Sequence, residues 1–465
     1  MDMRLIYCCI FYSFCFSTEA QFFYLGLDLS YVNEMEDCGV TYSVDNKEQD
    51  VYNIFKSNGA NLVRFRLWHS PSWYDNLNNG IRYSDFQDVV KSIQRAKSLG
   101  LNVLLDFHLS DNWADPSKQL VPLAWLPIVD DLPSLKDSLH QYIYKTLSDL
   151  DDLNLLPEMV QIGNETNKGI LLSPEDNATY TLDWPRNASL FNHAIKAVRD
   201  LESERSKEIK VLIHVADPSK AVWMTGQFVE NGVTDFDIIG MSYYWQWHLP
   251  TTIAQTGEAI TQLKNTYFEK EVMIVEVGAP WTNDNKDNAN NILFEVAPGY
   301  APASPNNQKQ WLIDLTQTVF DNNGIGVIYW EPAWQSNECS TQWALGSHYE
   351  NATFFDFENN LIADGGINWL NHNYGINTNN LNLNADNIEI IPMSKSKSIQ
   401  LHIKNNPLQS FHYIIYDLKG RVLDRRQIVN NNQLILLKNL PSGIYFIGLY
   451  QKDTMIKGLK FLIMG

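Results

Sequence analysis

Two glutamates, Glu165 and Glu276, each end a short apolar run and could supply a pair of reactive carboxylates. The first follows residues 157–164 and the second follows residues 271–275. A strand buried on both faces of a parallel sheet reads as a continuous aliphatic run, and parallel barrels place their chemistry at the C-terminal ends of such strands. Two carboxylates that face each other across such a site are typical of glycosidic bond cleavage. The pair therefore predicts glycoside hydrolysis.

The elements that must position this pair are eight apolar runs separated by helix-length segments. Strands that alternate with helices in this way predict a (β/α)8 barrel, also called a TIM barrel. Residues 83–99 and 188–205 show the 3.6-residue periodicity of covering helices. A doubly wound open sheet is the alternative, but no Gly-x-Gly-x-x-Gly turn supports it. The predicted strands are residues 23–30, 61–68, 102–108, 159–164, 211–216, 236–244, 272–276 and 326–331.

Polar residues gather at the C-terminal ends of these runs. Any one of them alone could be a satisfied buried polar group or a helix cap. Buried charges are costly unless they are paired, so polar groups at the end of every strand predict a concave polar site. The residues concerned are Asp28, Ser30, Arg64, Arg66, His69, Asp106, His108, Asp111, Asn164, Glu165, His214, Asp217, Ser242, Tyr244, Glu276, Trp330 and Glu331.

Composition fits one large acidic part followed by a basic appendage. The chain has 465 residues, of which 45% are hydrophobic, and this is enough to bury a large core. Its 14 Trp and 22 Tyr suit stacking on the flat apolar faces of sugars. Residues 388–465 carry 11 basic and 4 acidic residues, whereas the rest of the chain carries 24 and 50. This acidic excess argues against nucleic acid as a partner of the large part.

Six motifs lie on successive predicted strands, at residues 24–39, 63–71, 105–116, 161–165, 237–244 and 329–334. Together they resemble glycoside hydrolase family 53, the arabinogalactan endo-β-1,4-galactanases, and the resemblance covers about residues 22–370 in the right order. It implies a retaining enzyme that hydrolyses β-1,4-galactan, the type I arabinogalactan of pectin side chains, by double displacement. Asn164 followed by Glu165 would alone indicate only the wider clan of retaining barrel glycosidases, so an endo-glycanase acting on mannan or xylan is the runner-up.

The resemblance assigns roles to the two glutamates. It implies that Glu165 is the general acid/base and Glu276 the nucleophile. In a retaining site the two carboxyls lie about 5–5.5 Å apart, one ionised for attack and one protonated to assist the leaving oxygen. Burial and mutual repulsion raise the pKa of the acid, whereas a cation beside the nucleophile keeps it charged. Arg64 is the predicted cation.

Further residues are expected to bind the substrate. Asn164 is expected to hydrogen-bond the sugar 2-hydroxyl. Period-two alternation places Ser242 and Tyr244 on one face of their strand, so Tyr244 rather than Tyr243 is expected to hydrogen-bond Glu276. The resemblance further implies Asp106, His108 and His214 around the reacting sugar ring and Trp330 as the ring on which that sugar stacks. The other expected substrate-binding residues are Asp28, Arg64, Ser242, Trp334 and Tyr349.

The chain departs from the family pattern directly after the second glutamate. Family members usually read Glu-Thr-Ala-Tyr-Pro, whereas residues 276–280 here read Glu-Val-Gly-Ala-Pro, so a hydroxyl and an aromatic ring are lost. In the last loop Tyr349 stands in place of a Trp. These changes leave open a surface glycan-binding protein without catalytic activity, although intact Glu165, Asn164 and Arg64 favour an enzyme.

The loop after the seventh predicted strand corresponds to a calcium-binding loop in some relatives. Residues 283–291 offer oxygen ligands at Asp284, Asp287 and several Asn, but they contain no His and include Lys286. Calcium prefers six to eight oxygen ligands with several carboxylates. A solvated loop is therefore favoured over a metal site, and no cofactor is expected to be required.

The N-terminus predicts a secretory signal peptide over residues 1–20, because a short apolar core follows one basic residue. A buried first strand is the alternative. Three of the five cysteines leave with such a signal, so Cys38 and Cys339 remain. These two lie just beyond the first and eighth predicted strands, which are neighbours in a closed barrel, and they either form one disulfide or stay as free thiols.

The chain is expected to contain two domains after the signal peptide. Residues 21–374 form the predicted catalytic barrel, and the Asn-rich residues 375–387 read as a linker. Residues 388–465 show the short alternating strands of a small β-sandwich. A monomer is expected.

The C-terminal domain resembles the sorting domain of type IX secretion substrates. The similarity lies in residues 416–422 and 440–446 and in the Lys-containing end. It implies export by that secretion machinery to the cell surface or beyond. A carbohydrate-binding module is the alternative, but such modules usually present an aromatic platform and no Trp follows Trp369.

Overall fold

The computed structural model describes the chain in two parts. The first covers residues 23–179 and 182–374, and the second covers residues 388–393, 397–403, 411–418, 421–428, 432–437, 440–451 and 454–463. The predicted signal peptide and the predicted linker lie outside the described residues. Because the chain divides into two compact units at residue 376, each part is described by itself. None of the helices in these ranges is both long and apolar enough to cross a membrane.

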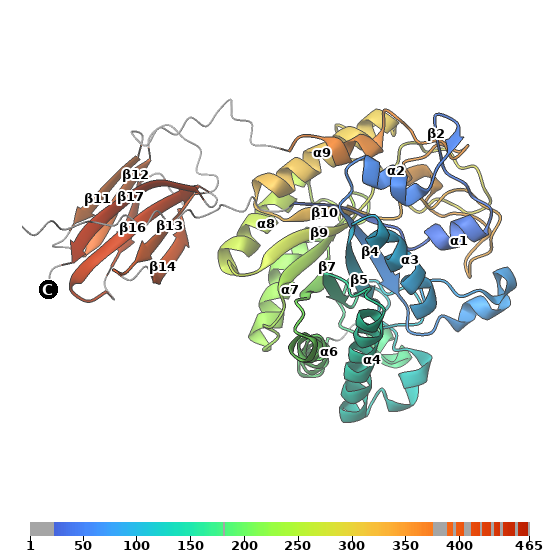
Figure 1. Ribbon diagram of the computed structural model, residues 1–465, viewed down its shortest axis with the longest axis horizontal. Coiled ribbons are helices and arrows are strands. Elements are labelled where there is room, and N and C mark those ends of the chain that lie inside the picture. The colour runs from blue at the N-terminus through green and yellow to red at the C-terminus, as the bar shows by residue number, and fades with distance from the viewer. Residues whose placement is uncertain are drawn as a thin grey trace, which may run out of the picture. The chain divides into compact units, whose positions relative to one another are not determined.

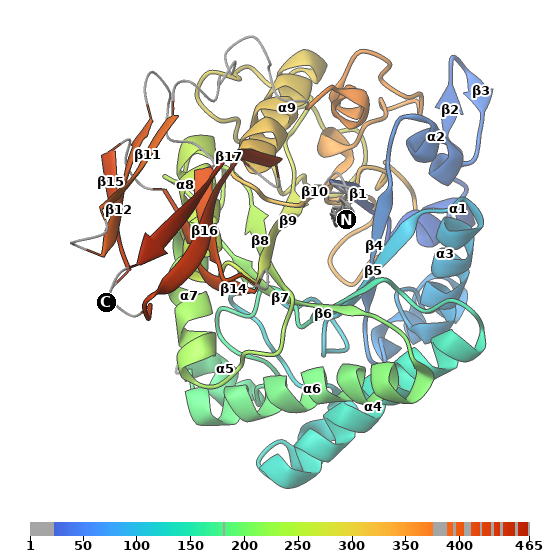
Figure 2. The ribbon, with the colours of Figure 1, turned by 60° about the vertical axis from the view of Figure 1, so that its left-hand side comes forward.

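Eight parallel strands close into a barrel in the first part, which confirms the predicted fold (Figure 2). The strands are β1 (Tyr24–Asp28), β4 (Leu62–Leu67), β5 (Asn102–Phe107), β6 (Met159–Ile162), β7 (Lys210–Ala216), β8 (Ile238–Tyr243), β9 (Glu271–Val277) and β10 (Gly326–Tyr329). They follow one another around the ring in chain order, and β10 pairs with β1 to close it. Each predicted strand is present.

Six of the eight observed strands end one or two residues earlier than predicted, and after two of them, β6 and β10, the backbone makes a left-handed turn. β6 ends at Ile162 and β10 at Tyr329. Directly beyond these ends, Glu165 and Glu331 have φ values of 46° and 47°, and Gly163 has a φ of 76°. Positive φ lies in the left-handed region and is incompatible with a continuing strand. The turns therefore mark the C-terminal edge of the barrel.

Helices cover the outside of the barrel (Figures 1 and 2). The two helices predicted from periodicity are α3 (Phe86–Ser98) and α6 (Trp184–Arg205). α3 buries Val89, Ile93 and Ala96 on one face, which is the stripe that holds an amphipathic helix against a sheet. The carboxylate of Asp85 accepts a hydrogen bond from the Asp88 backbone N–H and caps its first turn.

The first part contains further helices, several short 3-10 turns and one β-hairpin. The helices are α1 (Val32–Asp37), α2 (Val51–Ser57), α4 (Leu132–Asp152), α5 (Pro174–Thr179), α7 (Pro218–Glu230), α8 (Ile253–Thr266) and α9 (Pro305–Asp321). Short 3-10 turns are η1 (Ser72–Asn76), η2 (Asn78–Gly80), η3 (Leu123–Ile128), η4 (Glu350–Ala352) and η5 (Gly366–Asn371). β2 (Ser43–Val44) and β3 (Lys47–Glu48) form a hairpin.

The barrel interior changes from apolar to polar along the strands. Residues two apart on a strand point to the same side, and on four strands an apolar residue precedes a polar one at this spacing. The pairs are Leu62 and Arg64, Leu104 and Asp106, Met159 and Gln161, and Leu212 and His214. The apolar members belong to one buried cluster, which we call the lower layer. The polar members, together with Asp28, Ser242 and Glu276, form the upper layer.

Cys38 and Cys339 form a disulfide. Cys38 follows α1, which comes after β1, and Cys339 lies in the loop after β10. β1 and β10 are neighbours in the barrel, so the two loops emerge side by side. Of the two alternatives left open by the sequence, the disulfide is the one that the structure contains.

The second part consists of two antiparallel sheets, which confirms the predicted β-sandwich. Apolar residues from both sheets, such as Ile399, Ile435, Ile415 and Ile447, belong to one buried cluster, so the sheets pack face to face. One sheet has the order β11 (Ile388–Met393), β12 (Ser398–Ile403), β15 (Asn432–Leu436). The other has the order β14 (Val422–Gln427), β13 (Phe411–Tyr416), β16 (Gly443–Gln451), β17 (Thr454–Ile463).

Candidate active site

Arg64 is the centre of the upper layer. Its side chain is 1% exposed, and it contacts five oxygen acceptors. Nη1 donates to Asp28 at 2.8 Å and forms an ion pair with Glu276 at 2.9 Å, Nη2 donates to Asp106 and to Asn164 at 2.7 Å each, and Nε donates to Gln161 at 3.2 Å. A guanidinium presents its donors in a rigid planar fork. This set of acceptors therefore fixes both the charge and the plane of Arg64.

Glu276 is held by two donors. Its Oε1 contacts Nη1 of Arg64 at 2.9 Å, and its Oε2 accepts a hydrogen bond from the Tyr244 hydroxyl at 3.2 Å. The hydroxyl of Tyr243 points elsewhere and donates to the carbonyl of Thr251 at 2.8 Å. The geometric expectation that Tyr244 rather than Tyr243 bonds Glu276 is thus confirmed.

Glu165 and Glu276 differ in their electrostatic surroundings. Burial raises the pKa of Glu165 well above its usual value, the nearby charge of Glu276 raises it further, and a hydrogen bond from Ser242 opposes the rise. Burial also raises the pKa of Glu276, to about 7, but the adjacent Arg64 is the main influence against that rise. Since a neighbouring cation favours the charged form, Glu276 is the member of the pair that is favoured as a carboxylate and Glu165 is the one favoured as an acid.

His214 is neutral and organises the groups around Glu165. Burial lowers its pKa well below the usual value. Its Nδ1 faces two donors, the backbone N–H of Glu165 at 3.2 Å and the amide nitrogen of Gln161 at 3.0 Å, and one acceptor, the Oδ1 of Asn164, at 2.9 Å. Because the Glu165 N–H can only donate, we assign Nδ1 as the acceptor nitrogen. Nε2 must then carry the hydrogen, which it donates to the Ser242 hydroxyl at 2.8 Å. Ser242 is thereby left to direct its own hydrogen to Glu165.

A cavity of about 410 Å³ opens beside the two glutamates. Both glutamates line it, as do four of the residues expected to bind substrate. These four are Asn164, Tyr244, Trp330 and Trp334. A cavity of this size with apolar walls and a few convergent polar groups is typical of a ligand site.

Six other residues expected to bind substrate lie beneath the cavity rather than on its wall. Each is at most 2% exposed, and together they make up most of the upper layer and its support. They are Asp28, Arg64, Asp106, His108, His214 and Ser242. His108, for example, contacts Asp106 at 2.9 Å, and Asp106 in turn contacts Arg64. The structure thus places these side chains where they orient the lining residues.

Tyr349 does not reach the cavity, contrary to the expectation that it stacks on a sugar. Its side chain is 0% exposed, and its ring lies behind that of Trp330, with centroids 4.8 Å apart and planes at 84°. Trp334 does line the cavity, while its ring stacks on Tyr31 with centroids 3.9 Å apart. The buried aromatic residues therefore support the exposed faces of the lining ones.

Three lining tryptophans are absent from the sequence-based prediction, namely Trp113, Trp247 and Trp343. Trp247 and Trp343 are 46% and 44% exposed. Trp113 lies inside the motif of residues 105–116, and Trp247 follows Tyr244 by three positions, so closeness to a predicted site residue is a signal for both. Trp343 lies in the long loop after β10, where no periodic pattern points to it.

A second buried arginine fixes the aromatic wall. The guanidinium of Arg66 lies 4.2 Å from the ring centre of Trp113 and 4.4 Å from that of Trp68. Its Nη1 also contacts Glu331 at 3.3 Å. Cation–π contacts of a desolvated arginine are stronger than those at the surface. Arg66 therefore anchors Trp113 from beneath the cavity.

Asp287, one of the two predicted calcium candidates, faces hydrogen-bond donors. The carboxylate of Asp287 accepts backbone N–H groups from Ala289, Asn337 and Ser347 at 2.9, 3.2 and 2.6 Å. Among the described residues, no group of three or more His, Cys, Asp or Glu side chains could hold a metal ion. Calcium requires several converging oxygens, and the Asp287 carboxylate is already occupied by N–H donors, so its surroundings do not fit the ion.

Known proteins resemble this chain over the whole barrel. Residues 24–364 match the model of glycosyl hydrolase family 53, and residues 392–464 match the secretion system C-terminal sorting domain. The arabinogalactan endo-beta-1,4-galactanase of Cellvibrio japonicus (strain Ueda107) is 49% identical over 337 residues, covering 72% of this chain and 86% of that protein. The endo-beta-1,4-galactanase of Bacillus subtilis (strain 168) is 33% identical over 320 residues, covering 67% and 70%.

A solved structure has the same architecture. The family 53 catalytic domain of Ignisphaera aggregans superposes with a TM-score of 0.67 at 30% identity, covering 76% of this chain and 96% of that one. The chain therefore belongs to glycosyl hydrolase family 53 and is a glycoside hydrolase. Its C-terminal part is a secretion sorting domain.

Proposed function

We propose that this glycoside hydrolase is a secreted, retaining endo-β-1,4-galactanase that cleaves β-1,4-galactan in the type I arabinogalactan side chains of pectin. The relatives named as galactanases support the substrate. The observation that carries the mechanism is the unequal surroundings of the two glutamates. Arg64 contacts Glu276 at 2.9 Å and is the main group that lowers the pKa of Glu276, whereas its charge lowers the pKa of Glu165 only weakly compared with burial and the charge of Glu276.

In the first step the Glu276 carboxylate attacks the anomeric carbon. A bond forms between that carbon and a Glu276 oxygen while the bond to the bridging oxygen of the next sugar breaks. Protonated Glu165 gives its hydrogen to this oxygen, which leaves as the 4-hydroxyl of the shortened chain. Arg64 and Tyr244 hold the attacking carboxylate in place.

In the second step water releases the sugar. Glu165, now a carboxylate, takes a proton from a water molecule whose oxygen bonds to the anomeric carbon as the ester to Glu276 breaks. The ester is uncharged, so the repulsion that raised the pKa of Glu165 disappears while the intermediate exists. Glu165 can therefore act as an acid first and as a base second. Two inversions leave the configuration of the anomeric carbon unchanged.

Asn164 is suited to bind the sugar beside the reacting carbon. Its Oδ1 is occupied by Arg64, and its Nδ2 donates to the carbonyl of Ala114 at 2.8 Å. An amide nitrogen carries two hydrogens, so a second donor remains for the 2-hydroxyl. Because Asn164 lines the cavity, this hydroxyl is the contact that we propose.

Cleavage within the chain fits the shape of the cavity wall. Trp330 lies at the cavity with Trp113, while Trp247 and Trp343 stand partly exposed on the same lining. Several aromatic faces on one open cavity can stack on more than one sugar residue. Internal cleavage of a polymer is therefore proposed over release of single sugars from an end.

The sorting domain at residues 392–464 supports export of the enzyme. We propose that the secretion machinery is its partner and that the mature enzyme acts at the cell surface or in the medium. The enzyme acts as a monomer in this proposal, and its chemistry needs no cofactor, since side chains supply the nucleophile and the group that acts first as acid and then as base.

The substrate is tested by a time course of reducing-end release on equal masses of β-1,4-galactan, mannan, xylan and glucan. Galactan should be cleaved fastest, and the early products should be mixed oligosaccharides. The Glu276→Gln variant is the control for contaminating activity. Faster cleavage of mannan or xylan would assign the enzyme to the runner-up substrates, and binding without any cleavage would support a glycan-binding protein instead.

A further inference from the structure

Gly278 lies two residues after Glu276, and its surroundings leave no room for a side chain at this position. A Cβ at this position would lie 1.7 Å from the hydroxyl oxygen of Tyr349 and 3.0 Å from its Cζ. The backbone of Gly278 is not among those with positive φ, so an alanine could adopt its conformation. The reason for glycine here is therefore the tyrosine hydroxyl that occupies the place of a side chain.

The Tyr349 hydroxyl enters a packing site that also contains the hydrogen-bond partner of Glu276. The same Cβ at Gly278 would lie 3.2 Å from Cε1 of Tyr244, and the Tyr244 hydroxyl donates to Glu276 at 3.2 Å. The Tyr349 ring also meets Trp330 edge-on. Tyr349 thus lies next to two residues that line the cavity, although it is itself fully buried.

We propose that Tyr349 is a positioning residue that uses the space at Gly278 to hold Tyr244 on the nucleophile and Trp330 on the cavity wall. This inference rests on the proposed function, because it takes Glu276 as the nucleophile. Position 278 and position 349 both depart from the usual family sequence. The two departures depend on each other, because the absence of a side chain at Gly278 leaves the space that the Tyr349 hydroxyl occupies.

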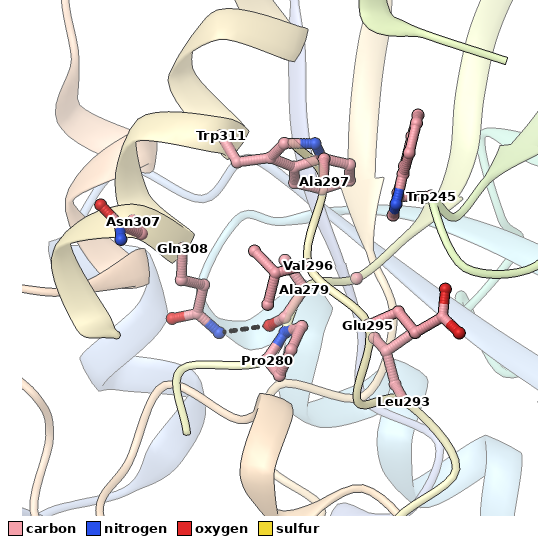
Figure 3. Close-up of a pocket in the computed structure, with 11 residues that line it drawn as sticks. Trp245, Ala279, Pro280, Leu293, Glu295, Val296, Ala297, Asn307, Gln308 and Trp311 are labelled. Carbon is pink, nitrogen blue, oxygen red and sulfur yellow. Dashed lines mark hydrogen bonds between the residues drawn. The ribbon is translucent and has the colours of Figure 1, made fainter. Parts of the chain in front are cut away.

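The adjacent departure at Ala279 has no such partner. Ala279 lines a small cavity of about 10 Å³. Figure 3 shows Pro280, Val296 and Trp311 among the other residues that line it. The carbonyl of Ala279 accepts a hydrogen bond from Gln308 at 2.8 Å (Figure 3). A volume of this size holds about one water molecule. Ala279 therefore borders a small unfilled space, and the proposed positioning role involves Gly278 and Tyr349 without Ala279.

The test is a double-mutant cycle of Gly278→Ala, Tyr349→Phe and the combined variant. Gly278→Ala should lower kcat about 100-fold with little change in KM, because displacement of a positioned group by about 1 Å costs that much. Tyr349→Phe removes only the hydroxyl and should lower kcat less than about 10-fold. The combined variant should recover at least about 10-fold over Gly278→Ala, because the clashing oxygen is gone.

A second readout separates positioning from general damage. A hydrogen bond to a carboxylate lowers its pKa, so displacing Tyr244 should raise the pKa of Glu276 and move the acidic limb of kcat/KM to higher pH. Arg64, Asp28, Asp106 and Glu165, which also act on Glu276, are unchanged in every variant. The combined variant should return the acidic limb toward the wild-type position.

Gly226→Ala is the matched control. Gly226 lies in α7, and a Cβ there would meet the hydroxyl of Tyr267 at 3.5 Å, an ordinary contact. This variant should keep wild-type kcat and acidic limb. The comparison isolates the clash from the general effect of replacing a glycine near a tyrosine.

Each outcome decides the proposal. Full activity of Gly278→Ala, or a combined variant no better than Gly278→Ala, would overturn it. If Gly278→Ala does not fold, recovery of folded protein in the combined variant supports the proposal and failure to recover contradicts it. The kcat ratios between variants are measured on the glycan that the wild-type enzyme cleaves fastest. A wrong assignment of galactan as substrate would therefore show in the wild-type substrate comparison and would leave these ratios interpretable.

Discussion

The upper and lower layers of the barrel interior come from the same strands, yet they serve different ends. In the upper layer Arg64 satisfies five acceptors, three of them carboxylates. Two residues earlier on the same strand, Leu62 packs into an apolar cluster with Leu104. Burial of apolar groups stabilises a fold directly, whereas buried charges are tolerated only when each has its oppositely charged or hydrogen-bonding partners. The upper layer is thus specialised for electrostatics and the lower layer for stability.

The largest effect that this comparison predicts is loss of turnover in Glu276→Gln. The variant should lower kcat by about four orders of magnitude or more, because the covalent step needs the carboxylate. Oligosaccharide binding should persist, since the isosteric amide leaves the cavity intact, and this is measured by calorimetry. Glu258→Gln, at an exposed position of α8, is the control and should retain wild-type turnover.

The second effect is the coupled loss of activity and stability in Arg64→Leu. Removing the cation leaves Asp28, Asp106 and Glu276 buried without their partner, which should lower the free energy of unfolding by about 3–5 kcal/mol. Denaturant unfolding measures the loss, and hydrolysis should disappear with it. A stable variant without activity would show that the network serves catalysis alone.

The third effect is stability loss without catalytic loss in Leu104→Ala. The side chain is 0% exposed in the lower layer, so truncation leaves a cavity and should lower the free energy of unfolding by about 2–5 kcal/mol. At a temperature where the variant is folded, kcat/KM should stay near the wild-type value. A large fall in kcat for the folded variant would break the distinction between the layers.

The smallest effect is a shift of the pH profile in Ser242→Ala. The Ser242 hydroxyl lowers the pKa of Glu165, so its removal should raise that pKa. Because hydrolysis requires protonated Glu165, the basic limb of kcat should move to higher pH. Ser92→Ala is the control, since Ser92 is buried in α3 and bonds to Asn33 and Asp88. A shift to lower pH in Ser242→Ala would contradict the proton arrangement around Glu165.

Much of the fold and of the site centre could be predicted because the signals are local. Continuous apolar runs located the eight strands, and period-two alternation selected Tyr244 as the partner of Glu276. Arg64 follows from the need of buried carboxylates for a cation. Each of these inferences uses spacing along one strand together with the rule that parallel strands present their ends at one edge.

The outer parts of the cavity could not be predicted because they depend on long loops. Trp343 has no periodic context, and its approach to the cavity follows the loop after β10, which the Cys38–Cys339 disulfide ties to α1. The burial of Tyr349 behind Trp330 depends on the empty space at Gly278, a contact between segments about 70 residues apart in the sequence. Side-chain type alone predicts an exposed stacking ring at Tyr349, and only the packing shows that it lies inside.

The proposed division of labour between Glu165 and Glu276 is tested most directly by the configuration of the first product. Proton NMR during hydrolysis of linear β-1,4-galactan, recorded before mutarotation, distinguishes the two anomers. A nucleophilic Glu276 and an acid/base Glu165 predict that the β-anomer forms first. An initial α-anomer would contradict the covalent intermediate on Glu276 and with it the account of the upper layer.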